Sequence, residues 1–286
     1  MILETKHIEW IDGAKGIAII CVILLHCLPD QGKMFSYLHI GQSVPVFVFI
    51  TAYLLTLHYK SIAEYYKKER IAKIMRTLLP PFFLIMVCEQ VVSYIHFGEL
   101  IGFKLLTFEG GCLGPGSYYL SIYLSIWFIM SFVIEFVRRI PIWASFLIML
   151  IISVFAEYLF ASIWQLSHME AIYRLSIVRY LMVVWLGCAF VRFSKVENSI
   201  MLVTAILTGL VYSIIRYMMN VNPAISIVPD YWNSAHWYSV LYVFVPIMFL
   251  QKIKYNDTLK WIGQHSWLIF CFQMFVFWCV MIMYKY

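Results

Sequence analysis

Long apolar runs follow one another along nearly the whole chain, and short segments richer in polar residues separate them. A run of about 20 apolar residues is long enough to cross the hydrocarbon core of a bilayer as a helix. The alternation of apolar and polar residues that is typical of a membrane β-barrel strand does not occur. The pattern therefore predicts an all-α, polytopic transmembrane helix bundle of about nine to ten spans. We predict spans at residues 13–29, 38–58, 77–96, 118–137, 141–161, 177–194, 198–218, 235–252 and 261–284.

The composition places the chain among integral membrane proteins. Hydrophobic residues make up 63% of it and charged residues only 13%, far from the averages of soluble proteins. No internal repeat, low-complexity segment or long linker divides the chain, so we expect a single integral-membrane domain over residues 1–286. The first apolar run carries Asp12, Lys15 and His26, which argues against a cleaved signal peptide.

Lysine and arginine residues cluster in alternate loops, and this predicts the orientation of the bundle. Short cytoplasmic loops are enriched in these residues. The clusters follow the even-numbered spans, for example Arg138 and Arg139 after the fourth and Arg192 and Lys195 after the sixth. We therefore predict a cytoplasmic N-terminus and an apolar surface covered by membrane lipids. This topology accounts for most of the formal charge of +6, so we predict no nucleic-acid partner.

Several common kinds of site are absent from the sequence. The seven cysteines form no CxxC pair and the eight histidines form no HxxxH or HExxH motif, so we predict no metal site. Neither a Walker loop nor a GxGxxG motif is present, which argues against an ATP-driven pump. Nothing in the sequence predicts an oligomeric state.

The first span carries ionisable residues in a region where each is costly to bury. Lys15 and His26 lie about 16 Å apart along a helix axis and are separated by almost a whole number of turns, so they share a face. An intramembrane histidine suits general-base catalysis, because imidazole titrates near neutral pH, but it can also be a packing residue. Asp12 could orient Lys15 or cap the helix.

Two further segments carry candidate chemistry. A basic segment leads into the third span and ends at Pro80-Pro81, where we expect the helix to break. Within it, Lys73 and Arg76 share a helix face that suits a phosphorylated ligand, or they anchor the chain at lipid headgroups. The outer loop 97–117, rich in glycine, could form a lid or a substrate-binding loop over the outer mouth, or a plain connection.

Three glutamates lie within or beside predicted spans. Each would be costly if it faced lipid, so each is expected to have a polar partner. We expect Glu135 to pair with the adjacent Arg138 and Arg139. Glu89 and Glu157 could assist in binding an acceptor or could pair with another polar residue.

Four stretches of the chain form an ordered set: IEWIDGAKGIAIICVILLH, VPVFVFITAYLL, KIMRTLLPPFF and WIGQHSWLIFCFQMFVF. Together they resemble the acyltransferase-three family of multi-spanning membrane acyltransferases. In the first stretch, Asp12, Lys15 and His26 occupy the positions of the family's acidic residue, basic residue and histidine. Two positions depart from the pattern, since Thr51-Ala52 stands for Ser-Gly and Gln273 stands near where many members have histidine.

The resemblance implies an enzyme of the bacterial plasma membrane that acts on sugars. It would transfer an acyl group, usually acetyl from cytoplasmic acetyl-CoA, to a hydroxyl of a cell-surface polysaccharide or lipid-linked glycan. His26 would act as general base beside Lys15 and Asp12. The donor site would contain the residues that hold the phosphates and line the acyl-CoA tunnel, which are Lys73, Arg76 and Arg179.

Two alternatives stay open. A proton-coupled transporter or flippase of glycan precursors would use His26 and the buried carboxyl groups as a proton relay, and would move a solute without consuming acyl-CoA. An inactive accessory subunit of a glycan assembly complex would account for the departures at Thr51-Ala52 and Gln273.

Overall fold

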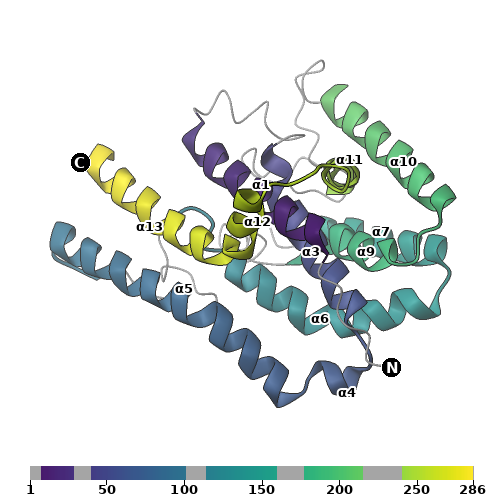
Figure 1. Ribbon diagram of the computed structural model, residues 1–286, viewed down its shortest axis with the longest axis horizontal. Helices are drawn as coiled ribbons and strands as arrows, with labels where there is room; N and C mark the ends of the chain where they lie inside the picture. The colour runs from purple at the N-terminus through teal and green to yellow at the C-terminus, as the bar shows by residue number, and fades with distance from the viewer. Residues whose placement is uncertain (1–7, 29–39, 101–113, 160–176, 215–239, 286) are drawn as a thin grey trace.

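The structure of the protein is a computed structural model that describes residues 8–28, 40–100, 114–159, 177–214 and 240–285. Within these ranges every regular element is a helix, as Figure 1 shows. The α-helices are α1 (Glu9–Cys27), α3 (Ser43–Leu57), α4 (Ile62–Tyr65), α5 (Lys68–Phe97), α6 (Tyr119–Arg139), α7 (Ile142–Tyr158), α9 (Leu181–Phe190), α10 (Lys195–Ser213), α11 (Phe244–Leu250), α12 (Asp257–Gln264) and α13 (Ser266–Lys285). Short 3-10 helices precede three of them, at η1 (Ile40–Gln42), η3 (Ile177–Tyr180) and η6 (Val240–Val243).

The described residues contain six helices that are long and apolar enough to cross a membrane. Shorter apolar helices cover Ile142–Ala156, Ile177–Phe190 and Leu241–Leu250. Each predicted span overlaps one segment of these two sets, so the all-helical character is confirmed. The count of about nine to ten spans and the cytoplasmic N-terminus stay predictions.

The centre of the bundle is formed by α3, α6 and α9, which pack against one another (Figure 1). Every residue of α9 from Leu181 to Ala189 is buried. Gly187 allows this helix to approach α3 closely, because a Cβ at Gly187 would lie 2.7 Å from the Cβ of Ala52. The outer helices α5, α7 and α10 instead expose apolar side chains such as Leu84 and Ile151. Exposed apolar surface on this scale fits contact with lipid.

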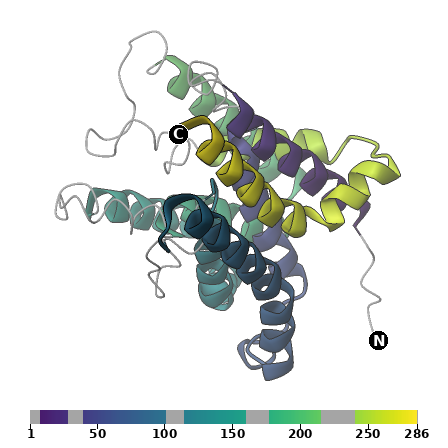
Figure 2. The ribbon, with the colours of Figure 1, turned by 90° about the vertical axis from the view of Figure 1, so that its left-hand side faces the viewer.

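The helix does not break at the paired prolines, so the sequence-based expectation of a break is wrong. α5 continues through Pro80 and Pro81 as one helix of 30 residues and lies beside α13 (Figure 2). A proline removes one backbone donor, but neighbouring helices can stabilise the affected turn within a membrane bundle. α13 contacts this part of α5, where the indole N–H of Trp267 donates a hydrogen bond of 3.1 Å to the carbonyl oxygen of Leu78, two residues before the prolines.

Glycines bring α1 into direct contact with α12. A Cβ at Gly16 would lie 2.2 Å from the carbonyl oxygen of Leu259, and one at Gly263 would lie 1.7 Å from the carbonyl oxygen of Asp12. Only glycine allows two helix backbones to approach this closely. The contact fixes the start of α1 against the helix that leads directly into α13.

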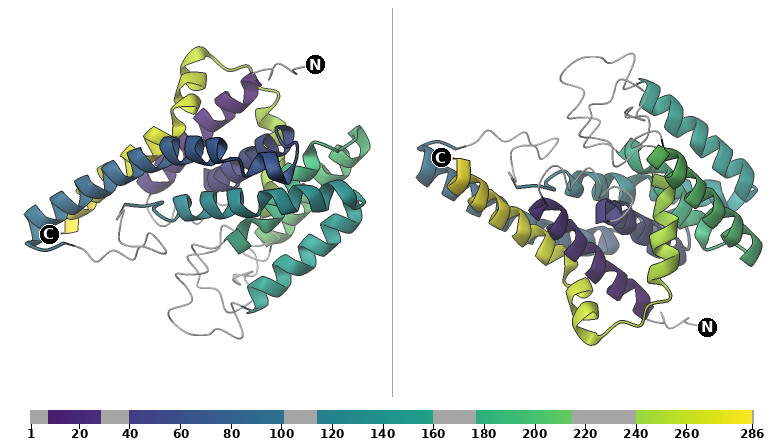
Figure 3. Two further views of the ribbon diagram at one scale, coloured as in Figure 1. Left: turned by 90° about the horizontal axis from the view of Figure 1, so that it is seen from below. Right: turned by 90° about the horizontal axis from the view of Figure 1, so that it is seen from above.

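α1 and α13 run in the same direction, as the right-hand view in Figure 3 shows. The start of α1 lies beside α12, and His26 near its end contacts Phe277 in the middle of α13. Two spanning helices that run in the same direction are separated by an odd number of crossings. This arrangement is what the nine-span prediction requires of its first and last helices.

The end of α6 is tied to the segment that follows α3. Glu135 Oε2 lies 3.2 Å from Arg139 Nε, which confirms the predicted pairing for that arginine. Glu135 Oε1 accepts a hydrogen bond of 2.9 Å from the Tyr59 hydroxyl. Arg138 instead donates to the carbonyl oxygen of Tyr59 and packs over its ring, with 4.8 Å between Cζ and the ring centroid. The side chain of Glu157 lies outside the described residues.

Candidate functional site

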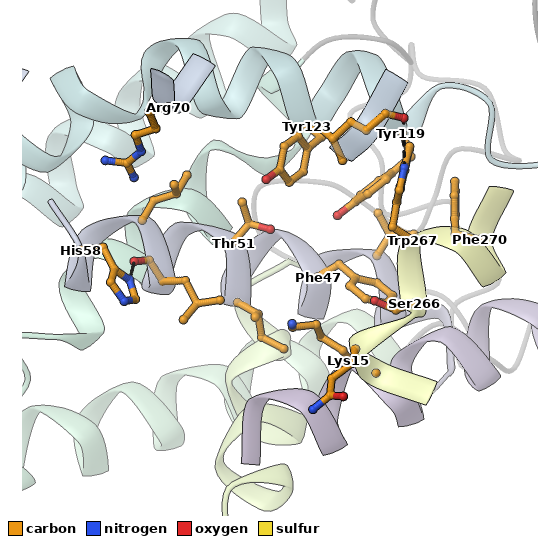
Figure 4. Close-up of a pocket in the computed structure, with 17 residues that line it drawn as sticks. Lys15, Phe47, Thr51, His58, Arg70, Tyr119, Tyr123, Ser266, Trp267 and Phe270 are labelled. Atoms are coloured by element: carbon orange, nitrogen blue, oxygen red, sulfur yellow. Dashed lines mark hydrogen bonds between the residues drawn. The ribbon is translucent and has the colours of Figure 1, made fainter. Parts of the chain in front are cut away.

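A pocket of about 430 Å³ opens among α1, α3, α5, α6, α12 and α13 (Figure 4). Its lining combines an aromatic wall with polar groups from five different helices and from the α12–α13 junction. The polar lining residues are Lys15, Thr51, His58, Arg70, Tyr119, Tyr123, Gln264 and Ser266. Apolar pockets with a few convergent polar groups are the usual form of a small-molecule site.

The pocket is long because it follows one stripe of α3. Val44, Phe47, Thr51, Leu55 and His58 line it in turn. These positions recur every three or four residues, which is the spacing of one helix face. From the first to the last they cover about 21 Å along the helix axis, so the pocket suits an extended ligand.

One end of the pocket carries basic side chains. Arg70 of α5 lines this end opposite His58, the C-cap residue of α3. The Arg70 guanidinium lies over the ring of Tyr65, with 4.6 Å from Cζ to the centroid. His58 Nδ1 lies 2.8 Å from the carbonyl oxygen of Leu54. A guanidinium held in place by an aromatic ring is well suited to bind a phosphate group.

Lys15 lines the pocket from α1, as Figure 4 shows, and its position depends on Asp12. Lys15 Nζ lies 3.2 Å from Asp12 Oδ1, one helical turn away. Asp12 Oδ2 accepts a hydrogen bond of 3.0 Å from Gln264 Nε2 at the end of α12. Asp12 is itself buried, so this pairing stabilises a charge that would be costly to bury alone. The structure thus places Lys15 in the pocket lining and its predicted partner Asp12 directly behind it.

The opposite end of the pocket is aromatic. Trp267 and Phe270 of α13 stack with 5.7 Å between centroids, and Tyr119 of α6 lies 5.3 Å from Phe270. The Tyr119 hydroxyl points toward Thr51 in Figure 4, so two hydroxyl groups interrupt an otherwise apolar surface. This end can enclose an apolar chain and still offer hydrogen bonds to a carbonyl group.

His26 lies beyond the aromatic end and does not line the pocket. Its half-buried ring contacts Phe277 edge to face at 5.5 Å between centroids. Phe277 is seven residues after Phe270 on α13, which corresponds to about 10 Å along the helix. Both the aromatic end of the pocket and the predicted general base His26 therefore contact α13, about 10 Å apart along its axis.

Lys73 and Arg76 are exposed on α5 and do not line the pocket. Residues three apart on an α-helix are rotated by about 60° relative to each other, so Arg76 is turned about 120° away from Arg70. Arg179 is buried in η3, with its guanidinium Cζ 5.6 Å from the Tyr180 ring centroid, and it is also outside the pocket lining. The roles predicted for these three residues stay predictions.

Sequence reasoning missed Arg70 and Gln264. Arg70 belongs to the basic segment already singled out, and its position one turn before Lys73 was the available signal. Gln264 had no local signal, because its partner Asp12 is remote in sequence. In the part of the chain that the structure describes, no three His, Cys, Asp or Glu side chains gather as a metal site requires.

A known protein family matches nearly the whole chain. The model of a protein family described as an acyltransferase domain matches residues 8–286. No curated protein and no solved structure matches the chain.

Proposed function

Because the chain belongs to the acyltransferase-three family, whose domain model matches residues 8–286, we propose that it transfers an acetyl group from cytoplasmic acetyl-CoA to a sugar hydroxyl. The acceptor in this proposal is a cell-surface polysaccharide or a lipid-linked glycan. The observation that carries the proposal is the elongated pocket, which has a basic end and an aromatic end. An acyl-CoA has the same polarity, with phosphates at one end and an acyl-thioester at the other.

The donor is proposed to enter with its phosphates at Arg70 and His58. Its pantetheine arm then follows the stripe of α3, and Lys15 lies along the way. The thioester passes the aromatic end near Tyr119 and continues along the face of α13 from Phe270 to Phe277, where it reaches His26. Lys73 and Arg76 are exposed on the following turns of α5, where they could contact the outer phosphates or lipid headgroups. Arg179, which is buried outside the pocket lining, would contribute to the acyl-CoA tunnel from the interior of the bundle.

His26 is proposed to act as the general base. It takes the proton of the acceptor hydroxyl while the hydroxyl oxygen forms a bond to the thioester carbonyl carbon. The carbon–sulfur bond then breaks, and the protonated imidazole returns the proton to the leaving thiolate. The products are an O-acetylated sugar and CoA with a free thiol. Asp12 contributes by holding Lys15, which is a positioning role.

The proposed setting is the plasma membrane of a bacterium, with the N-terminus in the cytoplasm and the bundle surrounded by lipid. With α1 crossing outward, its start and the α12 contact lie on the cytoplasmic side. His26, near the other end of α1, would then lie toward the outer side, from which the acceptor approaches. Donor and acceptor therefore enter from opposite faces.

The experiment is incubation of the purified protein with radiolabelled acetyl-CoA, with and without a purified cell-envelope polysaccharide. We expect label to pass to the polysaccharide and an equal amount of free CoA to appear only when the acceptor is present. The matched control is His26→Ala, which should show neither. Movement of a glycan precursor across vesicle membranes without CoA release would instead identify a transporter. If the protein shows neither acetyl transfer nor transport, the result would favour an accessory subunit.

A further inference from the structure

Gln273 lies on α13 between the pocket and His26. Phe270, which lines the pocket, comes three residues before it, and Phe277, which contacts His26, comes four residues after it. Spacings of three and four residues place all three side chains on one face of a helix. The path from the donor pocket to His26 therefore passes along the face that carries Gln273.

A non-helical turn, Gly114-Pro115-Gly116, packs directly onto this face. A Cβ at Gly114 would lie 2.1 Å from the carbonyl oxygen of Met274, and one at Gly116 would lie 2.7 Å from the ring of Phe270. Gly116 also has a φ of 97°, a left-handed conformation that favours glycine.

Two buried side chains hold this turn. The Gly114 N–H donates a hydrogen bond of 3.3 Å to Glu89 Oε1, and Gln273 Nε2 donates one of 3.1 Å to the carbonyl oxygen of Pro115. Glu89 is 0% exposed and Gln273 only 4%. The turn and both side chains thus form one polar cluster on an otherwise apolar helix face.

The carbonyl oxygen of Gln273 is the exception in this cluster. Within the described ranges, Oε1 of Gln273 is buried and has no hydrogen-bond partner. Leaving such a buried acceptor unsatisfied is costly, so a native protein rarely keeps one without a role. The open group in this cluster, Gln273 Oε1, is an acceptor, which favours a hydroxyl-bearing ligand over a phosphate.

We propose that Gln273 and the Gly114–Gly116 turn form the acceptor subsite, in which Gln273 Oε1 accepts a hydrogen bond from a sugar hydroxyl. The inference rests on the proposed acetyl transfer and assigns the binding of its second substrate. The bound hydroxyl neighbours the one that His26 deprotonates, so Gln273 sets which hydroxyl of the sugar reaches the thioester. The Nε2 group keeps its bond to Pro115 and fixes the amide in the required orientation.

The test compares Gln273→Met with Glu89→Leu in the purified protein, using acetyl-CoA and the same cell-envelope polysaccharide. Gln273→Met removes the carbonyl oxygen, whereas Glu89→Leu removes the other hydrogen bond to the same turn. We expect Gln273→Met to raise the KM for polysaccharide at least tenfold, with the Kd for acetyl-CoA unchanged within twofold. Glu89→Leu should raise that KM less than threefold. Thermal unfolding of both variants checks that they fold.

Equal increases in the polysaccharide KM for the two variants would overturn the inference, because Gln273 would then act only by holding the turn. An unchanged KM in Gln273→Met, or a Kd for acetyl-CoA raised in parallel, would also overturn it. In each of these cases wild-type transfer still supports the proposed function. If the wild-type protein transfers no acetyl group to the polysaccharide, both the function and the subsite are rejected.

Discussion

Gln264 Nε2 donates a hydrogen bond of 3.0 Å to Asp12 Oδ2, which joins residues separated by 252 positions in the chain. The other carboxyl oxygen of Asp12 lies 3.2 Å from Lys15 Nζ. The last hairpin, α12–α13, therefore holds the side chain of Asp12, and Asp12 in turn directs Lys15 to the pocket. This relationship explains why an acidic residue stands at the start of an apolar helix.

Asp12→Asn is expected to weaken acetyl-CoA binding about tenfold, because hydrogen bonds to charged groups contribute about 1.5–3 kcal/mol and Lys15 would lose one. Isothermal titration with acetyl-CoA measures the Kd. Asp257→Asn is the control, since its pair with Lys260 is 3.9 Å long and Asp257 is exposed. Equal effects of the two substitutions would show that Asp12 contributes only its negative charge and does not position Lys15.

His26→Ala is expected to lower kcat for acetyl transfer by about 100-fold to 10,000-fold, the usual contribution of a general base. The fold should persist, because the edge-to-face contact with Phe277 is worth only about 0.5–1.5 kcal/mol. Phe277→Leu controls for the loss of that contact and should keep most of the activity. A fully active His26→Ala protein would remove His26 from the catalytic step.

Arg70→Ala is expected to raise the Kd for acetyl-CoA at least tenfold, because Arg70 faces the pocket and a charged hydrogen bond contributes about 1.5–3 kcal/mol. Arg76→Ala removes the same charge from an exposed position of the same helix and should change the Kd less than about threefold. Titration of each variant with acetyl-CoA at the same ionic strength measures the two Kd values. The reverse ranking would place the phosphates outside the pocket, at Lys73 and Arg76.

Gly263→Ala is expected to lower the unfolding temperature sharply, because the new Cβ would meet the backbone of Asp12 at 1.7 Å and separate α1 from α12. Gly209→Ala is the matched control. Its Cβ would meet the side chain of Tyr242 at 2.4 Å, and a side chain can rotate away. Thermal unfolding in detergent should therefore rank Gly263→Ala well below Gly209→Ala, and similar unfolding temperatures would argue against a tight α1–α12 contact.

Tyr59→Phe is expected to cost about 1 kcal/mol of unfolding free energy through loss of the hydrogen bond to Glu135. Burial, together with that hydrogen bond, raises the pKa of Tyr59 from 10.0 to about 12. A raised pKa means that the folded protein holds the proton more tightly, so this stability is present below pH 10 and is lost as the pH rises toward 12. The difference between the unfolding free energies of wild type and variant should be smaller at pH 11.5 than at pH 9. An equal difference at the two pH values would contradict the assignment.

Local sequence patterns determined much of this protein. The apolar runs predicted an all-helical membrane bundle because a bilayer core accepts few other structures. Neighbours on one helix were also predictable, and both the Asp12–Lys15 pair and the Glu135–Arg139 pair follow from spacings of three and four residues. In these cases the chain's own geometry places the partners together, whatever the rest of the fold does.

Tertiary packing decided the rest. Helical spacing shows which residues share a face, but it does not show which face meets a neighbouring helix. The packing of α5 against the pocket therefore selected Arg70 over Lys73 and Arg76, and the α12–α13 hairpin supplied Gln264 to Asp12. The contact from Trp267 lies beside the prolines through which α5 continues unbroken. Each of these outcomes depends on atoms that are far apart in sequence, so no local pattern could specify them.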